Sequence, residues 1–254
     1  MSLQRLLLSV AWRLFPYAQA QVKTVNRVRL PLRARGDFAP LEEIFVQQAY
    51  APLVAALPQP ILSWVDLGCN AGMFSAWLYD RACAAGRGAE CRALLVDAGP
   101  CVNTAREFVR LNNVTNFQVE QACIGDGKPT IFYESKSSTR SSSTIRPSSR
   151  EKRVHVVSIA ATTLLDRHHF GPADLLKVDI EGAEKYLLAE KDLLRRFRAG
   201  ILEWHAETTD GATAARWITS QGGRIVHAVA QDGTTGDPLQ ARLGMLAWVM
   251  DAQS

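Results

Sequence analysis

The amino-acid sequence predicts an α/β fold built on a doubly wound, mostly parallel sheet. From residue 61 onward, short apolar runs alternate with longer helical patterns, and two of these runs end in a glycine-containing turn that opens a helix. Such alternation is typical of parallel sheets covered by helices on both faces. The 254 residues, 47% of them apolar, suit one large domain with an appendage or two small domains.

The expected elements follow one another regularly. Residues 41–57 have a helical pattern, and Pro58 and Pro60 break the chain before the first apolar run. The pattern then predicts strands over residues 61–67, 93–97, 117–123, 130–134, 154–159, 174–180, 200–205, 224–230 and 244–250. It predicts helices over residues 73–84, 102–111, 160–168, 183–197 and 212–221.

Residues 1–57 are expected to form a basic helical extension ahead of a main domain at 58–254. Residues 1–40 contain seven Lys or Arg against one Asp, whereas the net charge of the whole chain is only +4. Residues 1–20 predict an amphipathic helix whose apolar side carries Leu3, Leu6, Leu7, Val10 and Leu14. Three roles stay open for it: docking on the domain, peripheral contact with the inner face of a membrane, and targeting.

A polar insertion over residues 135–153 interrupts the alternation. Residues 135–149 include eight Ser, and the whole insertion has a net charge of +5. Two interpretations stay open: a solvated insertion without fixed structure, and a lid that orders over a bound cofactor or an anionic acceptor.

Several protein classes are excluded by the sequence. No stretch reaches the roughly 18 consecutive apolar residues of a membrane-spanning helix, because Arg13 interrupts the N-terminal candidate. Five Cys without metal-ligand spacing argue against a disulfide framework or a zinc site and favour a reducing, cytoplasmic location. No basic stripe with aromatic platforms runs through the domain, so nucleic acid is not an expected partner.

The first chemical motif is Val65-Asp66-Leu67-Gly68-Cys69-Asn70-Ala71-Gly72, between a strand and a helix. Glycines let the backbone approach a ligand closely, and a helix N-terminus offers free N–H groups. The glycines lie four residues apart, unlike the G-x-G-x-x-G of dinucleotide-binding proteins, and an acidic residue before them suits a cationic amino-acid moiety. The next strand ends at Asp97, whose carboxylate could accept both ribose hydroxyls of an adenosine or, alternatively, cap a helix.

The second motif, Leu176-Lys177-Val178-Asp179-Ile180-Glu181-Gly182-Ala183-Glu184, closes another apolar strand. Strand alternation places Lys177 and Asp179 on one face, where burial requires a charged partner or a ligand. The following strand supplies Glu203 and His205, again two residues apart. Charges at the carboxyl ends of central strands mark the crevice in which doubly wound sheets bind ligands.

Five segments together resemble one known family: D-x-G-x-N-x-G at 66–72, the acidic strand end at 97, Asn112-Asn113-Val114, Ala122-Cys123-Ile124-Gly125-Asp126, and K-V-D-I-E-G-A-E at 177–184. Over residues 61–205 the chain resembles the FkbM-type S-adenosylmethionine-dependent methyltransferases. The resemblance implies a class I (Rossmann-like) methyltransferase fold, a seven-stranded sheet with an antiparallel last strand, and S-adenosylmethionine as cofactor. It also implies methyl transfer, usually to an oxygen of a sugar, glycan or other natural product.

The resemblance also implies roles for individual residues. Asp66, Gly68, Asn70 and Gly72 would cradle the methionine end of the cofactor, Asp97 the ribose, and Asp126 the adenine edge. The chain departs from the family at one place, since it has Asp97-Ala98-Gly99-Pro100 where members usually have Glu-Pro.

Methyl transfer to an alcohol requires a base, and the candidates are His205, Asp179, Glu203 and Glu181, with Lys177 beside them. His205 is favoured because the usual pKa of histidine, about 6.5, lies near working pH, and a structural histidine is the alternative. Asp179, Glu203 and His205 also form an oxygen and nitrogen set of the kind that binds a divalent cation, although no metal is assigned.

Two other functions stay open beside methyl transfer. A nicotinamide-dependent oxidoreductase is disfavoured by the glycine spacing and by the lack of a Tyr-x-x-x-Lys motif. A catalytically inactive methyltransferase-like binding module is disfavoured by the intact motif at 177–184. The basic residues of the N-terminal segment and the insertion favour an acceptor that carries phosphate or carboxylate. The sequence leaves the oligomeric state open.

Overall fold

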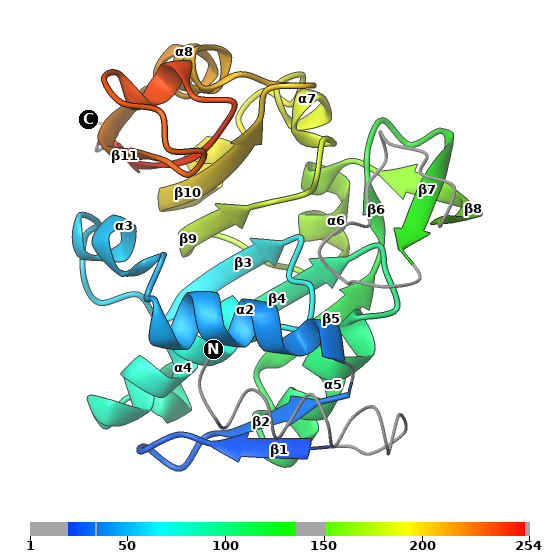
Figure 1. Cartoon of the computed structure of the whole chain (residues 1–254), viewed down its shortest axis with the longest axis vertical. Helices are drawn as coiled ribbons and strands as arrows, with labels where there is room; N and C mark the ends of the chain where they lie inside the picture. Colours follow the sequence, from blue (N-terminus) through cyan, green and yellow to red (C-terminus); the bar gives the residue numbers. More distant parts are fainter. Residues whose placement is uncertain (1–19, 34, 136–150, 252–254) are drawn as a thin grey trace.

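The computed structural model describes residues 20–33, 35–135 and 151–251 (Figure 1). Within these residues, seven strands form one sheet in the order β11-β12-β10-β9-β3-β4-β5. The strands from β10 to β5 in this order pair in parallel, whereas β12 runs antiparallel to both β10 and β11. The predicted doubly wound sheet with an antiparallel last strand is therefore confirmed.

The strands of this sheet are β3 (Ser63–Leu67), β4 (Arg92–Asp97), β5 (Phe117–Gln121), β9 (Ala173–Val178), β10 (Phe197–His205), β11 (Gly223–Ala230) and β12 (Leu243–Met250). The longer helices between them are α4 (Met73–Ala84), α5 (Val102–Leu111), α6 (Ala161–Arg167) and α8 (Gly211–Ser220).

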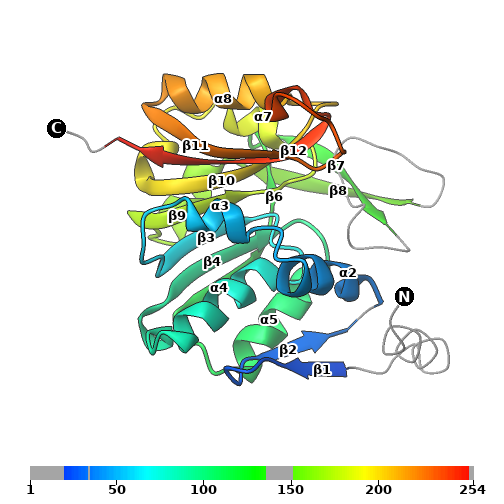
Figure 2. The ribbon, with the colours of Figure 1, turned by 60° about the vertical axis from the view of Figure 1, so that its left-hand side comes forward.

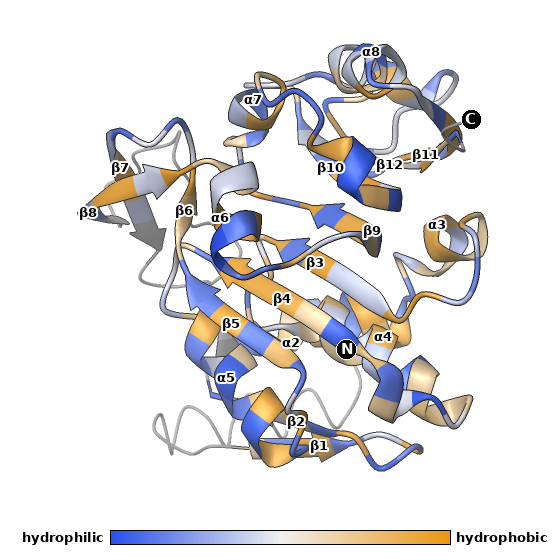
Figure 3. Cartoon of the chain, turned by 180° about the vertical axis from the view of Figure 1, so that it is seen from behind, coloured by the Kyte–Doolittle hydropathy of each residue, from blue (hydrophilic) through white to orange (hydrophobic). Residues whose placement is uncertain are grey.

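Two hydrophobic cores lie on opposite faces of the sheet. Along β4, Ala93 and Leu95 belong to one core and Leu94 and Val96 to the other, because successive side chains of a strand point to opposite faces. The first core packs against α4 and α5 (Figure 2), and the second against α6 and α8. Figure 3 shows the hydrophobic colour running along central β4 but alternating along edge strand β5, as burial on two faces or one requires.

The N-terminal extension differs from the expected helix. Residues 20–32 form a hairpin of β1 (Ala20–Lys23) and β2 (Arg29–Leu32) that packs against α5. The side chain of Asn112 hydrogen-bonds both backbone groups of Arg29 at 2.8 Å. Val28, Leu30 and Leu32 are buried in the core that also contains residues of α5. These apolar residues recur at every second position, as in a strand, but the many basic residues of this segment obscure the pattern in the sequence. The expected amphipathic helix falls almost wholly on residues 1–19, which lie outside the described residues.

Residues 41–57 also differ from one continuous helix. The segment forms α2 (Phe38–Leu41), a π-helical turn (Glu42–Val46) and α3 (Ala51–Ala55). Gln48 takes a positive φ of 54°, and Pro52 lacks the N–H that a continuing helix would use. The resulting bend places Tyr50 beside the carboxyl ends of the central strands.

The helix expected over 183–197 is much shorter. Only α7 (Glu184–Leu187) is α-helical, followed by a 3₁₀ turn at Leu194–Arg196. Asp192 has a φ of 63°, which ends any right-handed helix there. Glu190 turns back to accept the N–H groups of Ala161 and Thr162, both at 2.8 Å, and so caps α6.

A smaller sheet follows β5. It contains β6 (Cys123–Ile124), β7 (Pro129–Ser135) and β8 (Glu151–Ile159), with β7 and β8 forming an antiparallel hairpin. The strands predicted at 130–134 and 154–159 are confirmed. Most of the Ser-rich insertion, residues 136–150, lies outside the described residues, so the lid stays a prediction. Across residues 20–33, 35–135 and 151–251, none of the helices has the length and hydropathy needed to cross a bilayer.

Candidate active site

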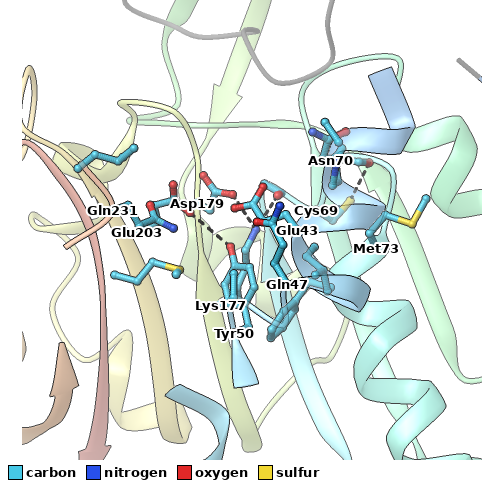
Figure 4. Close-up of a pocket in the computed structure, with 18 of the residues that line it drawn as sticks. Glu43, Gln47, Tyr50, Cys69, Asn70, Met73, Lys177, Asp179, Glu203 and Gln231 are labelled. Carbon is cyan, nitrogen blue, oxygen red and sulfur yellow. Dashed lines mark hydrogen bonds and ion pairs between the residues drawn. The ribbon is translucent and has the colours of Figure 1, made fainter. Parts of the chain in front are cut away.

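A cavity of about 860 Å³ lies at the carboxyl ends of β3, β9 and β10 (Figure 4). Residues from the segment 39–50 form part of its lining. Neighbouring parallel strands end at the same edge of a sheet, so the turn after β9 and the end of β10 meet there. The structure brings together all five side chains considered for catalysis, and the cavity is lined by Lys177, Asp179, Glu181, Glu203 and His205.

Lys177 is buried and holds the turn after β3 to the end of β9. Its Nζ donates to the carbonyl oxygen of Gly68 at 2.8 Å and forms ion pairs with Asp179 at 3.2 Å and Asp66 at 3.3 Å. Burial alone would lower the pKa of Lys177, but the surrounding carboxylates raise it overall. Lys177 is therefore an ammonium group that donates to Gly68 and Asp179 and forms an ion pair with Asp66.

His205 lies between two carboxylates. Its Nδ1 is 3.3 Å from Oε1 of Glu184, and its Nε2 is 3.5 Å from Oε2 of Glu181. Burial opposes the charged ring, but the hydrogen bond and charge of Glu184, with the charges of Glu181 and Asp179, raise the pKa of His205 to about 10. At neutral pH the ring is then an imidazolium, which has no lone pair to accept a proton. The assignment of His205 as the base stays a prediction, and these contacts favour a carboxyl group of the cavity in that role.

Two carboxyl groups of the cavity, unlike the ring of His205, are suited to accept a proton. Burial and the charge of Asp179 raise the pKa of Glu203 to about 8, and the same causes raise the pKa of Glu181 to about 8. The hydroxyl of Tyr50 donates to Oε2 of Glu203 at 3.4 Å. A carboxyl group with a pKa near working pH is a far better proton acceptor than an ordinary one, so Glu203 and Glu181 become the candidates for the base.

The possible cation site changes in composition. Ligand atoms of Asp179, Glu181 and His205 lie within 4.8 Å of one another, so Glu181 takes the place expected for Glu203. Asp179 already pairs with Lys177, and both ring nitrogens of His205 face carboxylates. A histidine can ligate a metal only as a neutral imidazole. We therefore interpret this group as a network of charged hydrogen bonds.

A narrower slot adjoins the cavity at the end of β4. Asp97 lines it, with its carboxylate oxygens accepting the N–H of Asn70 at 2.8 Å and of Gly99 at 2.7 Å. Burial raises the pKa of Asp97, whereas these two N–H donors lower it, and the net shift is upward. The oxygen that accepts from Gly99, Oδ1, also accepts from the thiol of Cys101 at 3.3 Å, so Asp97 retains capacity for one further hydroxyl donor, at Oδ2.

The slot is lined by residue types that can bind an adenosine. Val96, Ile124, Phe132 and Ile180 supply apolar surface, and Asp97 supplies hydrogen-bond acceptors at one end. Asn70 lines both the slot and the large cavity, and among the described residues its buried Oδ1 has no hydrogen-bond partner. An orphaned buried acceptor is costly unless a ligand donates to it. Gly68, Asn70 and Asp97 thus fit a cofactor with an adenosine and an amino-acid end.

Three residues expected at the cofactor are not part of either lining. Asp66 is 0% exposed, accepts a hydrogen bond from Ser75 at 2.7 Å and pairs with Lys177. Gly72 allows α4 to approach α5, because a Cβ there would lie 2.9 Å from the Cβ of Ala105. Asp126 faces solvent and pairs with Lys128 at 3.0 Å. Direct contact of these three residues with the cofactor stays a prediction that neither lining supports.

Three other residues of the site were not singled out from the sequence. Tyr50 comes from a segment far from the motifs, and Phe132 from the hairpin of the insertion. Glu184 is the last residue of the second motif, but its contact with His205 depends on how α7 turns back. Only Glu184 had a sequence signal, namely its place in a motif of charged residues after a strand.

The family of the chain follows from a match to a family model. The model of the methyltransferase FkbM domain matches residues 70–225. The chain belongs to this family. It is accordingly an S-adenosylmethionine-dependent methyltransferase, and the FkbM resemblance is confirmed. The match begins at residue 70, so the part of the cavity wall at 39–50 lies outside it.

Solved structures with a similar fold are distant in sequence. The precorrin-6y C5,15-methyltransferase from Geobacter metallireducens is 12% identical, with a TM-score of 0.45, over 81% of this chain and 89% of that one. An S-adenosylmethionine-dependent methyltransferase from Agrobacterium tumefaciens is 10% identical, with a TM-score of 0.45, over 92% and 70%. No curated protein matches the chain.

Proposed function

We propose that this FkbM methyltransferase methylates a hydroxyl oxygen of a sugar, glycan or other natural product. The observation that supports this is the pair of buried carboxyl groups, Glu203 and Glu181, in the cavity that adjoins the adenosine slot. An alcohol must lose its proton as its oxygen attacks a methyl carbon, and a carboxylate with a raised pKa is suited to accept that proton.

The contacts of the site residues indicate the role of each in the reaction. When bound, S-adenosylmethionine supplies an electrophilic methyl group and a neutral leaving group. Asp97 and Asn70 would hold its adenosine and amino-acid ends, while Lys177 fixes the turn at Gly68 that lies between them. Glu203 accepts the acceptor's proton, since Glu181 already faces the imidazolium of His205. The site also raises the rate by holding the attacking oxygen of the acceptor in line with the methyl carbon.

The charge of the cavity bears on the acceptor. Among the described residues, both cations of the lining, Lys177 and His205, are paired with carboxylates, whereas five acidic residues line the same cavity: Glu42, Glu43, Asp179, Glu181 and Glu203. In their charged forms the carboxyl groups of Asp179, Glu181 and Glu203 attract hydroxyl donors and repel phosphate, and Glu181 and Glu203 take this form above a pH of about 8. Such a wall favours an uncharged, hydroxyl-rich acceptor. The anionic acceptor expected from the sequence depends in part on basic residues outside the described part of the chain, and it stays a prediction.

Replacing Asp97 by Ala is expected to weaken binding of S-adenosylmethionine by about 5–150-fold, because a charge-assisted hydrogen-bonding group of the slot is lost. Calorimetric titration measures the change. Asp166→Ala is the matched control, since it removes a carboxylate that pairs with Arg196 on the surface and does not line the slot, and its affinity should equal that of the parent. Equal losses in the two variants, or none in Asp97→Ala, would contradict the assignment of Asp97.

Replacing Glu203 by Gln is expected to lower turnover by about 10²-fold or more while cofactor affinity is retained, because the proton acceptor is lost but its shape is not. Since the carboxylate form exists above its pKa, kcat/KM of the parent should rise with pH through about pH 8. The measurement is a screen of uncharged and charged alcohols by mass increase of one methyl group, then a pH profile on the acceptor found.

Glu207→Gln is the control for this variant, because Glu207 pairs with Arg242 on the surface after β10 and does not line the cavity. Its turnover and pH profile should match those of the parent. Full turnover by Glu203→Gln would remove Glu203 as the base, and a product methylated on nitrogen or carbon would reject the proposed oxygen acceptor.

A further inference from the structure

Glu184 is a buried carboxylate behind the wall of the cavity. It is 0% exposed and lines neither the large cavity nor the slot, so it cannot touch a bound ligand. Burial of a charge without partners is strongly unfavourable. The position of Glu184 therefore has to be explained by the groups that it contacts inside the protein.

The contacts of Glu184 join three segments around the site. One oxygen, Oε1, accepts the N–H of Gly182 at 3.1 Å and lies 3.3 Å from Nδ1 of His205. The other, Oε2, accepts from the hydroxyl of Thr208 at 3.3 Å. Glu184 thereby connects the turn after β9, the end of β10 and the residues that follow it. With Nδ1 held on this side, the opposite nitrogen Nε2 is directed to Glu181 at 3.5 Å.

We propose that Glu184 is a positioning residue for the methyl transfer: it holds His205 as a proton-bearing donor with Nε2 directed at Glu181, and so leaves the role of base to the carboxyl groups of the cavity. The proposal rests on the proposed function. It assigns no contact between Glu184 and substrate. It differs from a plain structural role because it concerns the proton carried by His205.

The charges around His205 agree with this assignment. Glu184 faces the ring from α7, Glu181 and Asp179 face it from the turn after β9, and Glu203 lies two residues away on its own strand, close enough to interact with it electrostatically. Lys177 is the nearby cation, but it is paired with Asp179. The hydrogen bond and charge of Glu184 do most to overcome the effect of burial and raise the pKa of His205 to about 10. The charge of Glu184 is therefore the one to remove.

The test is an NMR titration of the histidine ring nitrogens in the full chain, with five His in all and His205 assigned by comparison with His205→Gln. In the parent, His205 should stay protonated through pH 8. In Glu184→Gln, which keeps the size of the side chain and an oxygen for Gly182 or Thr208, the pKa of His205 should fall by about 1–3 units. Turnover should fall as well, with unchanged affinity for S-adenosylmethionine.

Glu190→Gln is the matched control, because Glu190 is also a carboxylate that accepts backbone N–H groups, but it caps α6 and makes no contact with His205. It should leave the titration of His205 unchanged. A parent His205 that is neutral at pH 8, or a pKa that Glu184→Gln does not lower more than Glu190→Gln does, would overturn the proposal.

The titration needs neither an acceptor nor turnover, so its outcome is separate from that of the proposed function. If the pKa of His205 behaves as expected but no alcohol is methylated, the proposed acceptor chemistry fails and the contact between Glu184 and His205 stands. If Glu184→Gln does not fold, the titration of the parent alone still decides whether His205 is a proton-bearing group.

Discussion

Replacing Lys177 by Met is expected to lower the free energy of unfolding by about 3–5 kcal/mol, because it leaves two carboxylates of the site without their cation. Asp66 is fully buried and Asp179 largely so, and Lys177 is the ammonium that pairs with both. Methionine fills a similar volume, so the loss comes from the unpaired charges and from the hydrogen bond to the carbonyl oxygen of Gly68. Urea unfolding of the purified chain measures it.

Two further variants make this expectation specific. Lys128→Met removes an ammonium group that is exposed and pairs with Asp126, and surface pairs of this kind contribute ~0–1 kcal/mol. The double variant with Asp66→Asn should recover part of the loss, since an amide oxygen can still accept from Ser75 without a charge to neutralise. If Lys177→Met is as stable as Lys128→Met, the buried network does not hold the turn after β3.

The fold could be predicted from the sequence because its main signal is local. Strands buried on both faces, such as β4, are continuous apolar runs, and a run of this kind can be recognised without knowing its neighbours. The convergence of Asp179 with Glu203 and His205 was equally accessible, since residues at the ends of adjacent parallel strands must meet. The convergence needed only the strand order.

The protonation of these residues was not accessible in the same way. His205 was expected to be a base from its usual pKa, but its charge depends on Glu184 and Glu181 standing on either side of the ring. That arrangement depends on the short α7 and on the positive φ of 49° at Glu181, which no periodicity of the sequence indicates. Electrostatics at a buried site is set by distances of a few ångströms.

Burial also differs between two aspartates that the family resemblance places at the cofactor. Asp66 is the last but one residue of β3 and Asp97 the last residue of β4, and Asp66 points inward to Ser75 and Lys177, whereas Asp97 lines the slot. A motif gives the residue type but not the face to which it points. Tyr50 shows the complementary limit, because its contact with Glu203 joins residues 153 positions apart.

Replacing Gly68 by Ala is expected to have the second large effect, a fall in melting temperature of about 6–12 °C together with loss of S-adenosylmethionine binding. Gly68 has a φ of +76°, and a Cβ there would lie 1.6 Å from the carbonyl oxygen of Asp179. The turn cannot move away easily, because the N–H of Gly68 donates to Val96 at 2.8 Å and its carbonyl accepts from Lys177. A loss of about 3 kcal/mol or more corresponds to this shift in a chain of this size.

Gly86→Ala separates the clash from the backbone conformation. Gly86 has nearly the same φ, +72°, but nothing lies within 4 Å of its Cβ position. Its replacement should cost only the left-handed conformation of a residue with a side chain, about 1–2 kcal/mol, and leave cofactor affinity unchanged. Thermal unfolding and calorimetric titration of both variants give the comparison. Equal losses of melting temperature would mean that the turn after β3 is free to shift. The close approach of Gly68 to Asp179 would then not fix the position of this turn in the site.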